Sequence, residues 1–385
     1  MSLGRAALKP VITRISRTFP PTTGTNINLD DNSQKTMGTR ILWIDLDYVW
    51  STDVIGTAHF HRPDPPVYYD EEMEESVRQV VLRDMQGNLD ERIDTVRIDG
   101  YPAPKMWQAL DGLSPKYLDL RCGFNEEIEF LDLNGLRYQW KGLESFSLNN
   151  FCTNHFTSSD QVPRVFSQIS CLELVWCCDF NFIPPGGATK LSQLRIFEND
   201  ACEMFIRIID GNPAVAKTLK TLDIESKNGC DYQREFDPVD FRIRIQRCLN
   251  LRVLRLSLSS QDGMDLDLAG YIPPSVEQLD MEVTCSFTFL CDMDDWIRRA
   301  SDATWLPNLK SFRISLDTGS AVNDLRQPEA WPEEDSETRD EHPIQTIKLT
   351  PSPALSQSFD QEFEKKKKSL YDLLKVTRPS VDISY

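Results

Sequence analysis

The chain has 385 residues, of which 40% are hydrophobic and 26% charged, and this composition excludes disorder along its whole length. The formal charge of −18 at pH 7 argues against a general nucleic-acid surface or a surface for anionic membranes, because both require a basic face. The length exceeds the usual size of one compact domain, which leaves two domains, a large barrel or a repeat array.

Targeting signals are scarce in this sequence. No stretch has the roughly eighteen uninterrupted apolar residues of a membrane helix, and residues 1–30 have no apolar core of the secretory type. The 10 cysteines form no C-x-x-C pair and no N-x-S/T acceptor occurs, which favours a cytoplasmic or nuclear protein. Mitochondrial import is the minor alternative, because residues 1–28 are basic and free of acids, although their prolines would break an amphipathic helix.

We predict that residues 1–38 are a disordered N-terminal segment and that residues 39–350 form a repeat array. Within 39–350 the apolar template L-x-x-L-x-L recurs. From Ile98 onward its last position returns after 22, 28, 26, 22, 28, 32, 25, 33 and 35 residues. The matches are Ile41/Ile44/Leu46, Ile93/Val96/Ile98, Leu118/Leu120, Leu143/Phe146/Leu148, Ile169/Leu172/Leu174, Leu191/Leu194/Ile196, Leu219/Leu222/Ile224, Leu251/Leu254/Leu256, Val276/Leu279/Met281, Leu309/Phe312/Ile314 and Ile344/Ile347/Leu349.

Segments with helical periodicity lie between these short strands. A strand and a helix in a unit of this size build a right-handed solenoid of the α/β class, with a parallel concave sheet and convex helices. Stacking is required because neither element can bury its apolar face alone. The expected helices are 74–86, 105–113, 162–168, 201–209, 238–248 and 292–300.

Three segments depart from the template. Residues 51–72 are rich in proline and aromatic residues and predict a loop. Residues 318–343 are acidic and poor in large apolar groups, so we expect an acidic flexible loop there. Residues 351–385 are expected to form a C-terminal capping helix and tail, because 358–376 has helical spacing with apolar residues able to cover the last repeat.

The repeats resemble those of irregular leucine-rich-repeat proteins, the kind found in many F-box substrate receptors. In that family an Asn or Cys closes each strand three residues after the last leucine, and Cys177 and Asn199 occupy that place here. Phe151, Lys227 and Asp317 depart from the pattern. The resemblance implies a possible role as substrate-recognition subunit of an F-box-type ubiquitin ligase, although residues 1–38 contain no L-P-x-E-like stretch of an F-box.

The residue between the last two apolar positions alternates in charge along the array. Neighbouring strands lie about 4.8 Å apart, so these side chains would form a ladder of opposite charges across a parallel sheet. We expect a structural charge ladder of Glu173, Arg195, Asp223, Arg255, Asp280 and Arg313.

We predict a non-catalytic scaffold that binds a protein partner on the concave sheet and is monomeric by itself. Aromatic and arginine side chains dominate interface energetics, and several flank the ladder. The expected partner-binding residues are Tyr117, Arg121, Trp176, Phe197, Glu225 and Glu282. No cofactor, metal, nucleic acid or membrane is expected.

An enzyme with a site near residues 45–70 is the contrasting hypothesis. Asp45 and Asp47 follow an apolar run and resemble the D-x-D of haloacid-dehalogenase-type phosphotransferases, although Tyr48 replaces a small residue. His59 and His61 point the same way on an extended chain and could bind a metal, but solvated loop histidines are the expected alternative.

Two further groups of residues could be functional sites, but we favour a structural role for each. Cys171, Cys177 and Cys178 are candidates for a nucleophile, but free cysteines are commonly buried hydrophobes. Lys365 to Lys368 could be a localisation signal or phosphate patch, yet Glu362, Glu364 and Asp372 flank them, which predicts a charged helix face.

Overall fold

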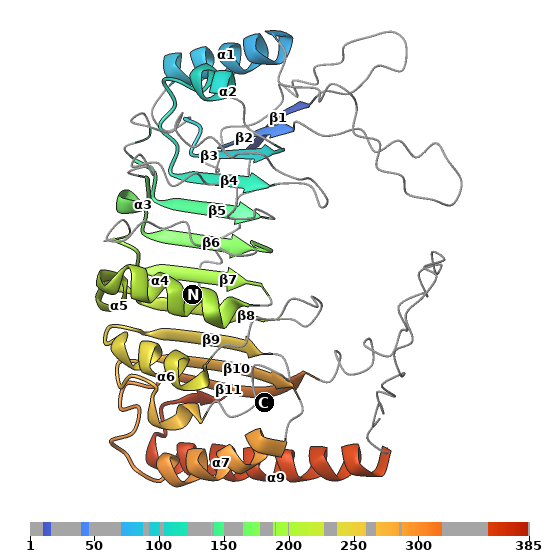
Figure 1. The fold of residues 1–385 in the computed structure, drawn as a ribbon, viewed down its shortest axis with the longest axis vertical. Helices are drawn as coiled ribbons and strands as arrows, with labels where there is room; N and C mark the ends of the chain where they lie inside the picture. The colour runs from blue at the N-terminus through green and yellow to red at the C-terminus, as the bar shows by residue number, and fades with distance from the viewer. Residues whose placement is uncertain are drawn as a thin grey trace, which may run out of the picture. The chain divides into compact units, whose positions relative to one another are not determined.

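A computed structural model gives the fold (Figure 1), and the chain divides into two compact units. The first unit comprises Met1–Glu198 and Met204–Leu219, and the second comprises Asn199–Glu203 and Lys220–Tyr385. The predicted array, 39–350, therefore extends over both units. The structure describes residues 11–16, 40–45, 71–87, 92–100, 104–121, 140, 142–149, 165–177, 188, 190–198, 200–226, 237–258, 267–284, 287–317 and 353–383.

The strands of the first unit pair in chain order, and every pair is parallel. Valine, leucine, isoleucine or phenylalanine fills the buried positions of each strand from β3 onward, and the alternate positions are half-buried or exposed. The strands are β1 (Val11–Ser16), β2 (Arg40–Asp45), β3 (Thr95–Asp99), β4 (Tyr117–Arg121), β5 (Ser145–Asn149), β6 (Cys171–Val175) and β7 (Gln193–Phe197).

The second unit repeats this arrangement with its own parallel strands in chain order. They are β8 (Thr221–Glu225), β9 (Val253–Leu258), β10 (Gln278–Thr284), β11 (Ser311–Asp317) and β12 (Asp382–Ile383). Together with the helices between them, these sheets confirm the α/β class with parallel strands.

Helices lie between several of the consecutive strands in both units, and their apolar sides pack against the buried side of the strands. Phe166 of α3 contacts Phe146 of β5, with ring centroids 5.7 Å apart, and Trp296 of α7 contacts Phe312 of β11 at 6.3 Å. The helices are α1 (Glu71–Gln86), α2 (Pro104–Ala109), α3 (Val165–Gln168), α4 (Ala201–Gly211), α5 (Pro213–Thr218), α6 (Pro238–Arg247), η4 (Leu268–Gly270), α7 (Phe287–Ala300) and α9 (Pro353–Thr377). The segments predicted as helices therefore all contain one.

A backbone clamp joins successive strands from β3 to β7 and from β8 to β11. The carbonyl of the residue that precedes a strand accepts two N–H groups from the start of the next repeat. Lys220 O, for example, accepts from Arg252 N at 2.8 Å and from Val253 N at 3.0 Å. The same bifurcated contact is made by the carbonyls of Asp94, Lys116, Glu144, Ser170, Arg252 and Glu277. These clamps fix the register in which the repeats stack.

The described residues of the N-terminal part differ from the predictions in two respects. Residues 11–16 form a strand, within the segment 1–38 predicted to be disordered, because the β-branched Val11, Ile12 and Ile15 favour an extended chain beside β2. The first repeat is also shifted: Leu42 and Ile44 are fully buried and aligned with Val96 and Ile98. Leu42 and Ile44 therefore hold the last two template positions, and the predicted match Ile41/Ile44/Leu46 lies two residues too late.

The C-terminal segment covers the end of the second unit's sheet. Helix α9 packs along α7 and buries Phe363, Leu370, Tyr371 and Leu374. The two-residue β12 then pairs with the first two residues of β11, where the sequence instead predicts a strand at 344–349. That segment and the acidic loop 318–343 lie outside the described residues.

Tyr371 completes the edge of β11 beyond β12. Its hydroxyl accepts from Ile314 N at 3.0 Å and donates to Ile314 O at 3.2 Å, so one side chain satisfies both backbone groups. Nearby, the buried Arg378 donates to the carbonyls of Ala300, Asp302 and Trp305. The end of α7 and the turn after it are thereby joined to the C-terminal segment. Within the described part of the chain, no helix has the length and apolarity to cross a membrane.

Replacing Tyr371 by Phe should lower the free energy of unfolding of the second unit by about 1–3 kcal/mol, because Ile314 N and O would stay buried without partners. Urea denaturation of the wild type and the variant measures this difference. Tyr117→Phe is the matched control, since Tyr117 is 44% exposed and water can replace its hydroxyl contacts. Equal losses in both variants would show that the hydroxyl of Tyr371 does not stabilise the edge.

Candidate functional site

The open face of each unit is the side of its strands whose residues alternate with the buried apolar ones. In β6, for example, Leu172 and Leu174 are fully buried while Cys171, Glu173 and Val175 are half-buried. The same alternation holds in β5 and β8. The residues of the open face are therefore the ones that the parallel stack presents away from its apolar layer.

Oppositely charged neighbours on the open face form ion pairs across adjacent strands. The pairs are Glu173–Arg195 at 2.7 Å, Asp223–Arg255 at 3.6 Å and Asp280–Arg313 at 2.6 Å. Each arginine side chain is about half exposed, between 49% and 51%. Exposed pairs of this kind contribute about 0–1 kcal/mol each, so they favour the register more than they stabilise the fold.

Charges at β3 and β4 pair along the strand instead. Arg97 donates twice to Asp99, at 2.8 and 2.9 Å, and its guanidinium lies 4.6 Å from the ring centroid of Trp43. Trp43 Nε1 donates to the same Asp99 at 2.7 Å. On the next strand, Arg121 Nε donates to Asp119 Oδ2 at 2.9 Å. Of these residues, the sequence predicted only Arg121 as partner-binding, and its side chain is 42% exposed.

Asp119 differs from the other members of this group in its hydrogen bonding. Its Oδ1 is buried and, among the described residues, has no hydrogen-bond partner. Desolvation by burial raises the pKa of Asp119 above its ordinary value, and the lowering effects of Arg121 and Arg97 do not cancel that rise. The carboxylate is therefore a cost to folding at neutral pH.

Trp176 and Phe197 are brought together at the ends of β6 and β7. Their rings meet edge to face, with centroids 4.6 Å apart and planes at 90°. Trp176 follows Leu172 and Leu174 at two-residue spacing, so a continued strand would bury it. Its φ of 54° ends the strand in the left-handed region, and Trp176 N donates to Phe197 O at 2.8 Å. The indole is consequently half-buried rather than in the core.

The other predicted partner-binding residues lie apart from this pair. Tyr117 is exposed at the start of β4. Glu225 of β8 and Glu282 of β10 are half-buried and flank Ser257 of β9, which donates to Glu282 at 2.8 Å. The structure therefore joins Trp176 to Phe197, but distributes the remaining predicted residues over several strands.

The structure shows a second charged row that the repeat template did not predict, which we call the strand-start row. It consists of Lys220, Arg252, Glu277 and Lys310 in the second unit, each directly before a strand. Lys310 Nζ lies 2.6 Å from Glu277 Oε2, and Arg252 Nη1 lies 3.8 Å from Glu277 Oε1. The row could have been found from sequence, because each member directly follows the first apolar residue of its repeat template.

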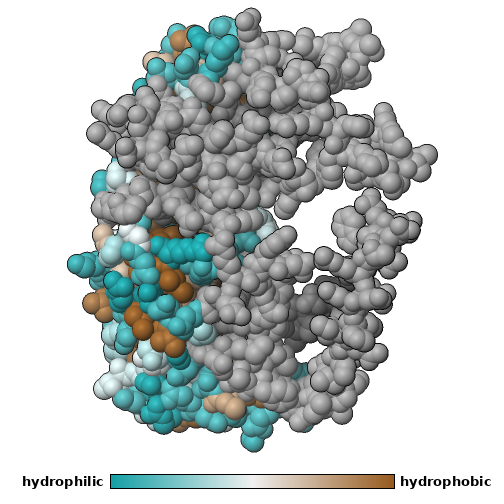
Figure 2. All heavy atoms as spheres, in the orientation of Figure 1, coloured by the Kyte–Doolittle hydropathy of each residue, from teal (hydrophilic) through white to brown (hydrophobic). Residues whose placement is uncertain are grey.

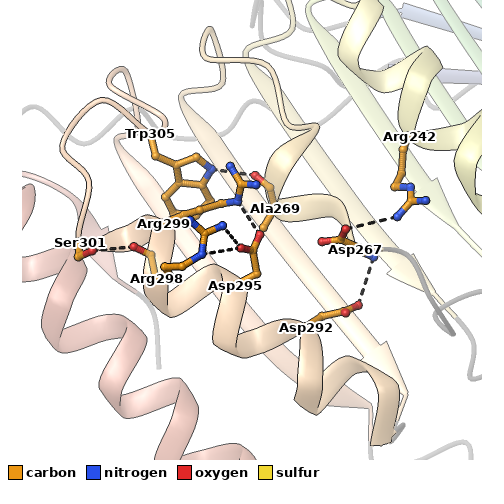
Figure 3. Close-up of polar contacts among 9 residues, drawn as sticks. All are labelled: Arg242, Asp267, Ala269, Asp292, Asp295, Arg298, Arg299, Ser301 and Trp305. Atoms are coloured by element: carbon orange, nitrogen blue, oxygen red, sulfur yellow. Dashed lines mark hydrogen bonds and ion pairs between the residues drawn. The ribbon is translucent and has the colours of Figure 1, made fainter.

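Polar contacts near α7 belong to packing (Figure 3). Asp295 accepts from Arg298 and, at 2.5 Å, from Arg299. Although burial opposes ionisation, these arginines hold the pKa of Asp295 below its ordinary value. Trp305 Nε1 donates to Ala269 O at 2.8 Å. Figure 2 shows mainly hydrophilic residues on this side of α7 and α9.

Several residues considered for catalysis fall outside the described part of the chain. These are Asp47, His59, His61 and Cys178, while Asp45 ends β2. Cys177 is buried and donates to Leu148 O at 3.4 Å. Burial raises the pKa of Cys171 above its ordinary value, so its thiol stays protonated at neutral pH. Among described residues, no three His, Cys, Asp or Glu side chains gather to hold a metal.

The lysine run of α9 is largely engaged within the second unit. Lys366 Nζ lies 2.8 Å from both Asp294 Oδ1 and Leu290 O, and Lys365 pairs with Glu362 at 3.3 Å. Lys367 is buried beside the rings of Phe363 and Tyr371. The contacts thus join α9 to α7.

No protein-family model matches the chain, and no curated protein matches its sequence.

Replacing Asp119 by Asn should raise the free energy of unfolding at pH 7 by about 0.5–1 kcal/mol, because the buried charge disappears while an amide oxygen can still accept from Arg121. The folded-state pKa of Asp119 lies above the ordinary value of 3.8, so the destabilising effect of its charge grows as pH rises from 3.8 to that folded pKa and is complete above it. The gain should therefore vanish as pH falls below 3.8. Denaturation midpoints between pH 3 and pH 7 measure both effects.

Asp280→Asn is the control for this prediction, because it removes the charge partner of Arg313 and should not stabilise the protein at pH 7. A destabilised Asp119→Asn variant at neutral pH would contradict the assignment of a desolvated charge.

Proposed function

We propose that this protein is a non-catalytic scaffold that binds a protein partner on its open face. In this proposal the two units are leucine-rich-repeat-like and belong to one right-handed solenoid, whose concave side is the open face. The regular alternation of buried and half-buried strand positions supports the proposal, as does the clamp repeated at successive strands.

Side-chain contacts between repeats give further support. Hydroxyl groups just before the first apolar residue of a repeat donate to carbonyls of the preceding repeat: Thr218 Oγ1 to Leu191 O at 2.6 Å and Ser275 Oγ to Leu251 O at 2.7 Å. Cys177 makes a comparable contact with Leu148 O at the other end of the strand. Such stitching between consecutive units is what a stacked repeat needs to satisfy its backbone.

The edge-to-face pair of Trp176 and Phe197 is the observation that carries the binding proposal. A left-handed conformation costs a residue with a Cβ atom about 1–2 kcal/mol. Trp176 adopts this conformation at a position where a continued strand would bury its side chain. Such local strain clusters at binding sites. Large half-buried aromatic residues are also the usual anchors of protein interfaces, because they bury much area at low entropic cost.

The double variant Trp176→Ala, Phe197→Ala should lose the partner. Wild type and variant would be tagged, purified from the cells that produce the protein, and compared by quantitative mass spectrometry. An interface that loses two central aromatic anchors is expected to weaken by about 2–4 kcal/mol or more, which is enough to remove most of the partner from the purified material.

Val239→Ala, Ile243→Ala is the matched control, because these side chains are also apolar and are 45% and 39% exposed on α6. It should retain the partner. Circular dichroism of each variant checks that the fold is intact. If a folded aromatic double variant kept every partner, the binding surface would not be this pair.

The narrower role of substrate receptor for an F-box-type ubiquitin ligase rests on the resemblance of the repeats alone. Its direct test is whether the full-length protein captures the linker subunit of that ligase. The protein's own monomeric state and its place in the cytoplasm or nucleus are likewise part of the proposal.

A further inference from the structure

The strand-start row places a basic strip on an acidic protein. Three of its four members are cations, and the side chains of Arg252 and Lys310 are 63% and 69% exposed. Lys220 is exposed as well. The whole chain has a formal charge of −18, so an excess of positive charge within this row is opposite in sign to the net charge of the protein.

Charge pairing within the row is incomplete. Glu277 is the only anion of the four, and its carboxylate is shared by Lys310 and Arg252. The hydrogen bond from Lys310 holds the pKa of Glu277 below its ordinary value, so the group stays ionised and cancels one cation. In the ladder of the same unit, by contrast, Asp223 and Asp280 match Arg255 and Arg313 one for one.

The backbone clamps hold this row at fixed spacing. Lys220 O accepts from Arg252 N, Arg252 O accepts from Glu277 N at 2.7 Å, and Glu277 O accepts from Lys310 N at 2.7 Å. The same residues that carry the charges are therefore the ones whose main chain is joined. Strands β8 to β11 run in the same direction, so their starts lie along one edge of the sheet (Figure 1).

We propose that the strand-start row binds an acidic segment of a protein partner. Four strands at about 4.8 Å spacing cover about 14 Å, which an extended chain spans with about five residues. Carboxylates of such a segment would contact Lys220, Arg252 and Lys310. Preorganised cations reduce the cost of ordering on binding, and their charge raises the association rate of an acidic partner.

An acidic protein segment suits this row better than a nucleic acid does. The row holds only three cations, whereas a nucleic acid also brings its remaining phosphates close to a chain with 60 acidic and 42 basic residues. A short acidic peptide exposes fewer charges to that repulsion. The row uses none of the residues of the aromatic pair, so this inference does not depend on the proposed function.

The test uses the full chain and a fluorescent peptide of about twelve residues with alternating Glu and Ser, which exceeds the length of the row. Anisotropy titrations compare it with a peptide in which Gln replaces Glu, and with a single-stranded RNA of the same length. The wild type should bind the Glu peptide alone, and the affinity should fall as salt is raised, because exposed charges are screened.

The variant Lys220→Gln, Lys310→Gln should bind the Glu peptide roughly three- to tenfold more weakly. Arg255→Gln, Arg313→Gln is the matched control, because it removes the same charge from half-exposed cations of the same unit. Its affinity should change less than twofold. Thermal unfolding of each variant verifies that the fold is retained.

Several outcomes would overturn the inference. Equal weakening in both variants would reduce it to an effect of net charge, and preference for RNA would assign the row to another class of partner. A third variant replaces Glu333, Glu334 and Asp335 of the chain itself by their amides. If only this variant bound the peptide, the occupant of the row would be the chain's own acidic segment and not a partner.

Discussion

A carbonyl that accepts two amide groups recurs at successive strands from β3 to β7 and from β8 to β11, and the rest of the fold depends on this contact. It sets how one repeat follows the next before any side chain is considered. Within each unit, this repetition aligns buried residue with buried residue and open-face residue with open-face residue. The ion pairs, the hydroxyl stitches and the strand-start row are consequences of that alignment.

The position and alignment of most strands could be predicted from the sequence, because buried apolar residues alternate with exposed ones along a short parallel strand. Leu222 is aligned with Leu254, and Ile224 with Leu256, as their template positions require. The pattern failed where apolar residues were too frequent to define a register. Around Ile41 to Leu46 the template selects Ile41, Ile44 and Leu46, whereas the buried residues of this strand are Leu42 and Ile44. The two-residue β12 has no pattern of its own, since its place depends on the neighbouring β11.

The candidate site could be predicted from the sequence only in part. Alternating charges at one template position predicted which residues would be neighbours, because position in the repeat determines position on the sheet. The contact between Trp176 and Phe197 depends on a left-handed turn, which no apolar period encodes. Whether Asp119 pairs along its strand or across strands depends on side-chain rotamers and burial, which a one-dimensional pattern does not contain. The positions of the strand-start row follow from the template. Its proposed role in binding depends on the exposed fractions of its lysine and arginine side chains, which the sequence does not contain.

The hydroxyl of Tyr371 also constrains how such an array can change in evolution. At Ile314 a side chain replaces the backbone of a following strand, so the sheet of the second unit has no place for another repeat beyond β11 unless the tyrosine is displaced. The strand of a repeat inserted between earlier strands could pair with a strand on each side. Duplication is therefore compatible with the interior of the unit and incompatible with its C-terminal end, where the last repeat and helix α9 must be inherited together.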